Sequence, residues 1–195
     1  MKKIIQRQVR IARYVMYRET LLDFRDHVWT FVGAFCGIAI IGLMARGRFE
    51  MVDNVFLIGS FGASCVLVYG VVNSPLAQPR NLVGGHVVSA IVGVTVHYML
   101  PNEIWLASAL AVAMSIVGMQ ITKTLHPPGG ATALIANIGS EKIKSLGYMY
   151  VLCPVLAGVL ILLLVALLVN NLAPHRSYPL NRNWKKMLLR RYRRS

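Results

Sequence analysis

The sequence predicts an all-α bundle of transmembrane helices, and composition and charge spacing carry the prediction. The chain has 195 residues, of which 56% are hydrophobic and 14% are charged, against about 25% charged in ordinary soluble domains. That composition excludes a disordered chain and argues against a soluble globule. Charged residues are absent from 28–45, 54–79, 81–102, 104–122, 124–140 and 145–175. A membrane-spanning helix needs roughly 20 apolar residues, so these stretches indicate a multi-pass membrane protein.

The net charge of +14 is concentrated at the two ends of the chain. Seven of the 21 Lys and Arg residues lie in 1–26, and eight lie in 176–194. We therefore divide the chain into a basic amphipathic segment (1–26), a transmembrane domain (27–172) and a basic tail (173–195). The positive-inside rule predicts that both termini are cytoplasmic, in the cell inner membrane, with anionic lipids at both tails. Bases concentrated in the tails argue against a nucleic-acid partner.

Six apolar segments make up the expected domain. They lie near 28–45, 54–72, 82–100, 104–122, 126–139 and 148–170. The fifth is short and has Pro127 and Pro128 at its start, while Gly59, Ser60 and Gly62 interrupt the second. Both are therefore expected to be broken or re-entrant helices. The chain crosses the membrane six times if they span it and four times if they re-enter.

A weak internal similarity suggests two repeats, 27–100 and 103–172. Phe61-Gly62-Ala63-Ser64 resembles Gly129-Gly130-Ala131-Thr132, and each motif stands between two longer apolar segments. Three crossings per half would invert the second half relative to the first, as in many transporters with broken helices near the midplane. Small residues also recur by chance in membrane helices, so the alternative is that there is no repeat.

The segment after residue 125 suggests an anion site. Proline suits the first turn of a helix, so Pro127 and Pro128 can begin one, and Gly129 and Gly130 could then offer free N–H groups beside the Thr132 hydroxyl. A helix N-terminus carries partial positive charge that attracts small anions. Ser60, Gly62 and Ser64 could supply a second N-terminus from the other half. The alternative is that these small residues only let helices pack closely.

Two histidines and one loop add candidate residues. His126 stands at the start of the fifth segment, where it could bind an anion, carry a proton or cap a helix. His86 lies inside an apolar segment, where an ionisable residue is by default a functional hypothesis. Arg80 and Asn81 precede it, and Arg80 could attract anions or simply anchor the helix at the interface. The three cysteines are far apart and predict neither a disulfide nor a metal site.

Several motifs carry a family resemblance. Leu125-His126-Pro127-Pro128-Gly129-Gly130-Ala131-Thr132 closely resembles the signature of the HPP family of integral membrane proteins, and Phe61-Gly62-Ala63-Ser64 is similar to it as well. Further matches are 74–81, 84–86, 170–172 and 178–179. The resemblance implies a domain usually described with four transmembrane helices, and it implies nitrite as a substrate because plant and cyanobacterial members are associated with nitrite transport.

The sequence therefore predicts a transporter or channel for a small inorganic anion, most of all nitrite. The alternative is a non-transporting scaffold or regulatory subunit. An enzyme is not expected, because the apolar segments contain no Asp or Glu for acid–base work and no nucleotide-binding motif appears. No cofactor is expected, proton coupling would have to use His126 or His86, and a homo-oligomer stays an open alternative.

Overall fold

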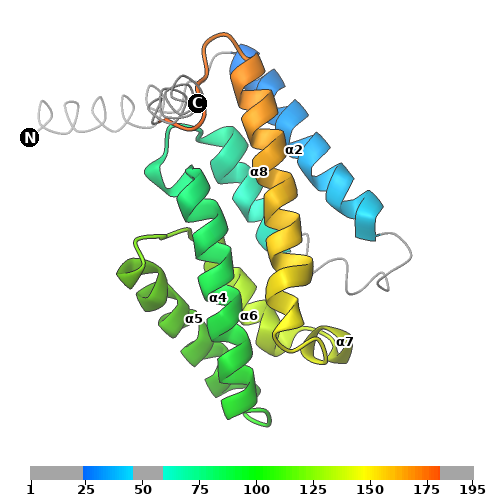
Figure 1. The fold of residues 1–195 in the computed structure, drawn as a ribbon, viewed down its shortest axis with the longest axis vertical. Helices are drawn as coiled ribbons and strands as arrows, with labels where there is room; N and C mark the ends of the chain where they lie inside the picture. Colours follow the sequence, from blue (N-terminus) through cyan, green and yellow to red (C-terminus); the bar gives the residue numbers. More distant parts are fainter. Residues whose placement is uncertain (1–23, 46–58, 181–195) are drawn as a thin grey trace, which may run out of the picture.

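The computed structural model describes residues 24–45 and 59–180, and all regular secondary structure in these ranges is helical (Figure 1). The predicted all-α fold is therefore confirmed. The expected amphipathic helix before residue 23 and most of the basic C-terminal tail lie outside the described residues.

Four helices are long and apolar enough to cross a membrane. They are α2 (Phe24–Ala45), α4 (Pro79–Met99), α5 (Ile104–Ile121) and the segment Val151–Leu172. This last segment consists of the π-helical turn η3 (Val151–Leu156), which is kinked at Cys153, followed by α8 (Ala157–Leu172). Their mean hydropathy is between 1.5 and 3.1 in the most apolar window. The polytopic transmembrane bundle predicted from composition is confirmed at this level.

Two further helices are too short to span a bilayer. Gly59–Gly70 ends in the π-helical turn η1 (Val66–Gly70), and α6 is Pro128–Ile138. At about 1.5 Å per residue each is about 17 Å long, against a hydrocarbon core of about 30 Å. α6 begins at Pro128, where the missing proline N–H has no intrahelical partner to lose. These are the second and fifth segments, which the sequence predicts to be interrupted.

The six main helices pack as two groups of three (Figure 1). The first group is α2, Gly59–Gly70 and α8, and the second is α4, α5 and α6. Each group therefore contains one short helix and two long ones, and one of its two long helices comes from the other half of the sequence. One hydrophobic core lies in the first group around Tyr69 and Leu162, and the second group is filled around Ala90, Ala111 and Ala133. Contacts of α4 with α8 join the two groups.

The two short helices run in opposite directions. Gly70 ends beside Asp26, at the end of the molecule where α2 begins. Asn137, near the end of α6, donates to the Gly93 carbonyl (3.2 Å), towards the other end of α4. Opposite directions are what an inverted pair of repeats would produce, but repeat symmetry itself stays a prediction.

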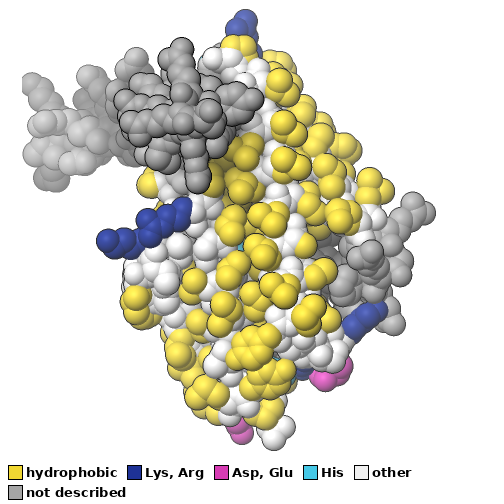
Figure 2. Space-filling view, viewed as in Figure 1, with side chains coloured by type: hydrophobic (Ala, Val, Ile, Leu, Met, Phe, Trp, Pro, Cys, Tyr) yellow, Lys and Arg dark blue, Asp and Glu magenta, His cyan; other side chains and the backbone are white. Residues whose placement is uncertain are grey.

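Hydrophobic side chains cover much of the face that Figure 2 shows. Leu160, Leu164, Leu168 and Leu172 follow one another at intervals of four along α8 and are 48–67% exposed. Such a stripe on the outside of a helix, with Ser and His side chains buried inside, is the distribution expected when lipid surrounds the bundle.

The first residues of the predicted basic tail (173–195) pack against the bundle. Tyr178 is 1% exposed, and its hydroxyl donates to the Ala77 carbonyl (2.8 Å). Burial raises the pKa of this hydroxyl above its usual value, so it stays protonated as a donor. Because Tyr178 and Arg176 find buried partners, the packed domain continues to about residue 180. It also begins earlier than residue 27, since α2 starts at Phe24.

Smaller elements complete the chain. The 3₁₀ turn η2 (Pro75–Ala77) leads into α4, and α7 (Glu141–Lys144) connects α6 to the last long helix. The Ser140 side chain caps α7 by accepting from the Ile143 N–H.

Candidate functional site

Four polar side chains meet in the centre of the bundle. Ser64 comes from the short helix Gly59–Gly70, His86 from α4, His126 from the loop before α6, and Thr132 from α6. Each is 0% exposed. All four are among the residues predicted from the sequence, and we call them the histidine cluster.

Hydrogen bonds join the histidine cluster into one chain. The Ser64 Oγ lies 2.7 Å from His86 Nε2 and 3.0 Å from His126 Nε2. On its other side, His86 Nδ1 lies 2.7 Å from Thr132 Oγ1. His126 Nδ1 faces the Leu76 carbonyl of η2 at 2.9 Å. All four nitrogens of the two rings therefore have a polar partner.

Aromatic side chains and a backbone contact hold the cluster in place. The His86 and His126 ring centroids are 5.1 Å apart, and Phe61 meets His86 edge-on at 5.6 Å. Tyr150 is 2% exposed and donates its hydroxyl to the Thr132 carbonyl (3.0 Å). Rings packed on several sides limit the movement of the imidazoles.

Glycines in α4 let the loop that carries His126 lie against this helix. A Cβ at Gly85 would stand 2.5 Å from His126 Cβ and 2.8 Å from the Thr124 carbonyl oxygen. One at Gly84 would stand 2.4 Å from Thr124 Cγ2. Any larger side chain would push His126 away from His86, so these glycines allow the two rings to meet.

The proposed repeat motifs converge on one ring. Ser64 ends the Phe61–Ser64 motif and Thr132 ends the Gly129–Thr132 motif, so they occupy equivalent positions in the predicted repeats. In the structure their hydroxyls lie on opposite nitrogens of His86. His86 is thus the point at which the two short helices meet.

The two glycines before Thr132 play a different part from the one predicted. The Gly129 N–H donates to the His126 carbonyl (2.8 Å), and the Gly130 N–H donates to the Pro127 carbonyl (3.1 Å). A Cβ at Gly129 would stand 2.7 Å from Ser89 Oγ and 2.9 Å from the Gly85 carbonyl oxygen. The N–H groups are therefore engaged with backbone, and Gly129 serves close packing of α6 on α4, which is the alternative that the sequence left open.

The remaining predicted residues surround the cluster without joining it. Ser60 contributes its carbonyl, which accepts from the Ser64 hydroxyl at 3.1 Å. A Cβ at Gly62 would meet nothing within 4 Å, so this glycine faces away from the site. Pro127 is exposed, and the buried Pro128 begins α6.

Arg80 and Asn81 bind the chain itself. Arg80 Nη2 donates to the Thr122 carbonyl (2.8 Å), and Asn81 Nδ2 donates to the Leu125 carbonyl (2.8 Å). Both therefore attach the His126 loop to α4. Arg80 is exposed at the surface, and neither residue belongs to the histidine cluster.

Sequence reasoning missed three contributors. They are the Leu76 carbonyl, the Phe61 ring and the Tyr150 hydroxyl. Leu76 and Phe61 lie inside motifs that carry the family resemblance, which was the available signal. Tyr150 stands at the start of an apolar segment and belongs to none of the motifs, so the sequence does not indicate that its hydroxyl has a role in the site.

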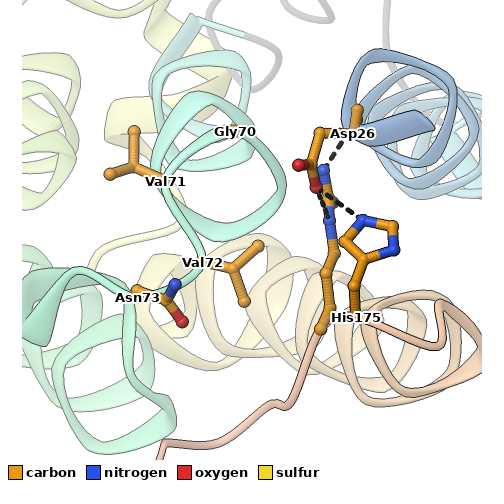
Figure 3. A pocket seen from close by; sticks show the side chains of 7 residues that line it. Asp26, Gly70, Val71, Val72, Asn73 and His175 are labelled. Atoms are coloured by element: carbon orange, nitrogen blue, oxygen red, sulfur yellow. Dashed lines mark hydrogen bonds and ion pairs between the residues drawn. The ribbon is translucent and has the colours of Figure 1, made fainter. Parts of the chain in front are cut away.

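A second polar group lies at the end where α2 begins (Figure 3). Arg176 donates from Nε to the Asp26 carboxylate (2.7 Å), and His175 Nε2 lies 2.9 Å from the same oxygen. Arg176 also donates to the Tyr69 carbonyl (3.1 Å), near the end of the short helix Gly59–Gly70. A cavity of about 190 Å³ lies beside this group. A cation is favourable at a helix C-terminus, so Arg176 stabilises the end of that helix.

Comparison with known families agrees with the geometry. The family model for the transmembrane region of HPP proteins matches residues 19–179. The chain belongs to the HPP transmembrane family. The HPP match includes every residue of the histidine cluster and also Arg176 and Tyr178.

Two curated HPP relatives are transmembrane proteins of Dictyostelium discoideum. One is 46% identical over 166 residues, covering 84% of this chain and 58% of the relative. The other is 46% identical over 160 residues, covering 80% of this chain and 51% of the relative. This HPP chain therefore spans little more than half the length of these relatives. No solved structure matches it.

Proposed function

We propose that this HPP protein is a membrane transporter for a small inorganic anion, with nitrite as the first candidate. The observation that carries the proposal is the histidine cluster, four fully buried polar side chains at the meeting point of two short helices. Polar groups inside a membrane domain are costly, and they are usually retained for a substrate or ion pathway. A scaffold that carries nothing would have no use for them.

Nitrite is proposed because of the family and the local charge. The HPP resemblance implies nitrite for plant and cyanobacterial members. Among the described residues the carboxylates are Asp26, Glu103 and Glu141, and all three lie outside the cluster, in first turns or in a connection between helices. A site without carboxylates favours an anion over a cation.

The geometry supports transport better than hydrolysis. The Ser64 hydroxyl contacts two histidines, as a nucleophile would, but neither ring is oriented by a carboxylate as in a serine hydrolase. His86 Nδ1 faces the Thr132 hydroxyl, and His126 Nδ1 faces a backbone carbonyl. Within the described residues, no three His, Cys, Asp or Glu side chains approach closely enough to hold a metal ion. We therefore extend the proposal to a carrier without enzymatic activity.

We further propose that the end carrying Arg25, Arg80, Lys123 and Arg176 faces the cytoplasm of the inner membrane. Among the described residues this end has four bases and the one carboxylate of Asp26. The opposite end has Lys142 and Lys144 with Glu103 and Glu141. The excess of bases at the first end follows the positive-inside rule.

The experiment is a flux assay with the purified protein in liposomes. Entry of nitrite, nitrate, formate and chloride is measured separately against empty liposomes, because nitrous acid leaks through lipid. We expect nitrite to enter faster than it enters empty liposomes. If none of the four anions enters faster than into empty liposomes, the proposal is refuted. His126→Gln is expected to reduce the rate by about tenfold or more, the size of effect produced by losing one charged hydrogen bond.

Ser89→Ala is the matched control for His126→Gln and for Ser64→Ala. Ser89 lies in α4, close to His86, and is 0% exposed, and its Oγ has no hydrogen-bond partner among the described residues. It is thus a buried serine outside the histidine cluster. We expect Ser89→Ala to keep the wild-type rate while Ser64→Ala loses it.

A further inference from the structure

The Ser64 hydroxyl has three hydrogen-bonding neighbours. They are the Ser60 carbonyl at 3.1 Å, His86 Nε2 at 2.7 Å and His126 Nε2 at 3.0 Å. A hydroxyl carries one proton and two lone pairs. It satisfies three neighbours when it donates to one of them and accepts from the other two. Because a carbonyl can only accept, the full set requires that both histidines donate to Ser64.

The other side of His126 fixes its tautomer. His126 Nδ1 faces the Leu76 carbonyl at 2.9 Å, so Nδ1 must carry a proton. A neutral imidazole then has a bare lone pair on Nε2. In that state the only hydroxyl proton of Ser64 must point to His126, and the Ser60 carbonyl receives no hydrogen bond from the Ser64 hydroxyl.

The cluster is therefore one proton short when all its groups are neutral. It contains five contacts that each need a proton: Ser64 with Ser60, His86 and His126, His86 with Thr132, and His126 with Leu76. The two hydroxyls and two neutral imidazoles supply four protons. A fifth proton would complete the network.

Only one of the two histidines can hold that proton without loss of a contact. On His126 it gives an Nε2–H that donates to Ser64, and Ser64 turns its own proton to the Ser60 carbonyl. His86 Nε2–H fills the second lone pair of Ser64, and Thr132 donates to His86 Nδ1. With the added proton on His86 instead, His86 Nδ1–H would donate to Thr132. The Ser64 hydroxyl would still have to donate to His126, so it could not donate to the Ser60 carbonyl.

We infer that His126, with Ser64 and Ser60, is a binding site for one proton that enters together with the transported anion. The entry of this proton together with the anion rests on the proposed function. Protonation adds one H⁺ to His126 Nε2. The Ser64 O–H bond then rotates, so that it donates to the Ser60 carbonyl and no longer to His126, and no other hydrogen bond changes. The transported pair is then electrically neutral.

The surroundings of His126 explain why an anion must accompany the proton. The groups that contact it are the His86 ring from α4, with ring centroids 5.1 Å apart, the Ser64 hydroxyl from the short helix at 3.0 Å and the Leu76 carbonyl from η2 at 2.9 Å. Arg80 and Asn81 of α4 bond instead to the carbonyls of Thr122 and Leu125. No carboxylate of the described chain is among the groups that contact His126. A buried cation without a counter-charge is strongly disfavoured, so the anion supplies the missing charge.

The test is ¹⁵N NMR of the histidine-labelled protein in lipid nanodiscs, with sodium nitrite or with sodium gluconate, whose anion is too large to be carried. In gluconate at neutral pH we expect neutral His126 with its proton on Nδ1. With nitrite at the same pH we expect both nitrogens of His126 to be protonated. A change from about nine-tenths neutral to about nine-tenths protonated at one pH requires an affinity for the proton about 100-fold higher. Signals are assigned with His86→Gln and His126→Gln. Protonation of His86 instead, or no effect of nitrite on His126, would overturn the inference.

Variants and flux separate this inference from the proposed function. Ser64→Ala removes the acceptor for the added proton, so nitrite should no longer protonate His126, whereas Ser89→Ala should behave as wild type. Retained protonation in Ser64→Ala contradicts the inference. In liposomes with a pH-sensitive dye inside, one proton should enter per nitrite. Nitrite entry without proton entry overturns the coupling and leaves transport intact, while absence of any flux overturns transport and leaves the NMR result to decide the proton site.

Discussion

Gly93 of α4 lies directly against the backbone of Ala133 in α6. A Cβ at Gly93 would stand 2.6 Å from the Ala133 carbonyl oxygen and 2.8 Å from its Cα. This is the closest kind of helix contact, because backbone atoms cannot turn aside as a side chain can. It sets the distance between the two helices that carry His86 and Thr132.

The first prediction compares two glycines. Gly93→Ala should destabilise the protein by about 1–3 kcal/mol, the cost of overpacking a tight contact. Gly62→Ala should be neutral or slightly stabilising, because nothing lies within 4 Å of its added Cβ and alanine is the better helix former. Thermal unfolding in detergent measures both. Equal stability of the two variants would show that α4 and α6 are not in contact as described.

The second prediction concerns Arg176, whose side chain is 6% exposed beside the Asp26 carboxylate, which is 20% exposed. Arg176→Met should cost about 2 kcal/mol or more, somewhat below the 3–5 kcal/mol for breaking a fully buried pair, because water reaches Asp26. Arg80→Met serves as the control, since Arg80 is exposed and its guanidinium makes one described hydrogen bond, to Thr122. A change below about 0.5 kcal/mol is expected there. Similar losses in both variants would contradict the role given to Arg176.

The third prediction concerns Thr132. Thr132→Val removes the donor to His86 Nδ1 and should cost about 1–3 kcal/mol, because a buried acceptor loses its partner. Thr132→Ser keeps the hydroxyl and should recover most of this stability. Unfolding curves of the two variants are compared at neutral pH. If serine were no better than valine, the hydrogen bond to His86 would not contribute.

The fourth prediction concerns membrane sidedness. Lys123 lies at the end of the bundle where α2 begins, and Glu141 lies beyond α6 at the other end. In a variant without the native Cys36, Cys65 and Cys153, single cysteines at these two positions should react with an impermeant maleimide from opposite sides of the membrane. Both positions are exposed. Labelling from the same side would show that the segment between these positions, the loop with His126 followed by α6, re-enters instead of crossing the membrane.

Much of the site was predictable from residue types. Charge-free stretches predicted the long helices, and interruptions at Gly59–Gly62 and Pro127–Pro128 predicted the short ones. His86 is predicted because an ionisable residue is rare in an apolar segment, and Ser64, His126 and Thr132 are predicted because they stand at the expected helix N-termini. These signals are local, so a single sequence suffices to show them.

The pairing of those residues could not be predicted. Ser64 and His126 are 62 positions apart, and their contact depends on how four helices cross. The residues near His86 on its own helix do not show which side chains from other helices bond to it. Gly129 was misleading for the opposite reason, because a glycine beside prolines favours an open helix end, while here its N–H bonds to backbone and its missing Cβ makes room for α4. Tertiary packing decides such cases.

The exchange of long helices between the two groups has a consequence for how the domain is assembled. Because α8 packs with α2, and α4 packs with α5 and α6, a chain cut in the connection after residue 99 would leave each fragment without one of the two long helices that pack on its own short helix. Neither fragment could insert as a finished unit, and both would expose polar groups to lipid until they met. The domain must therefore mature as a whole.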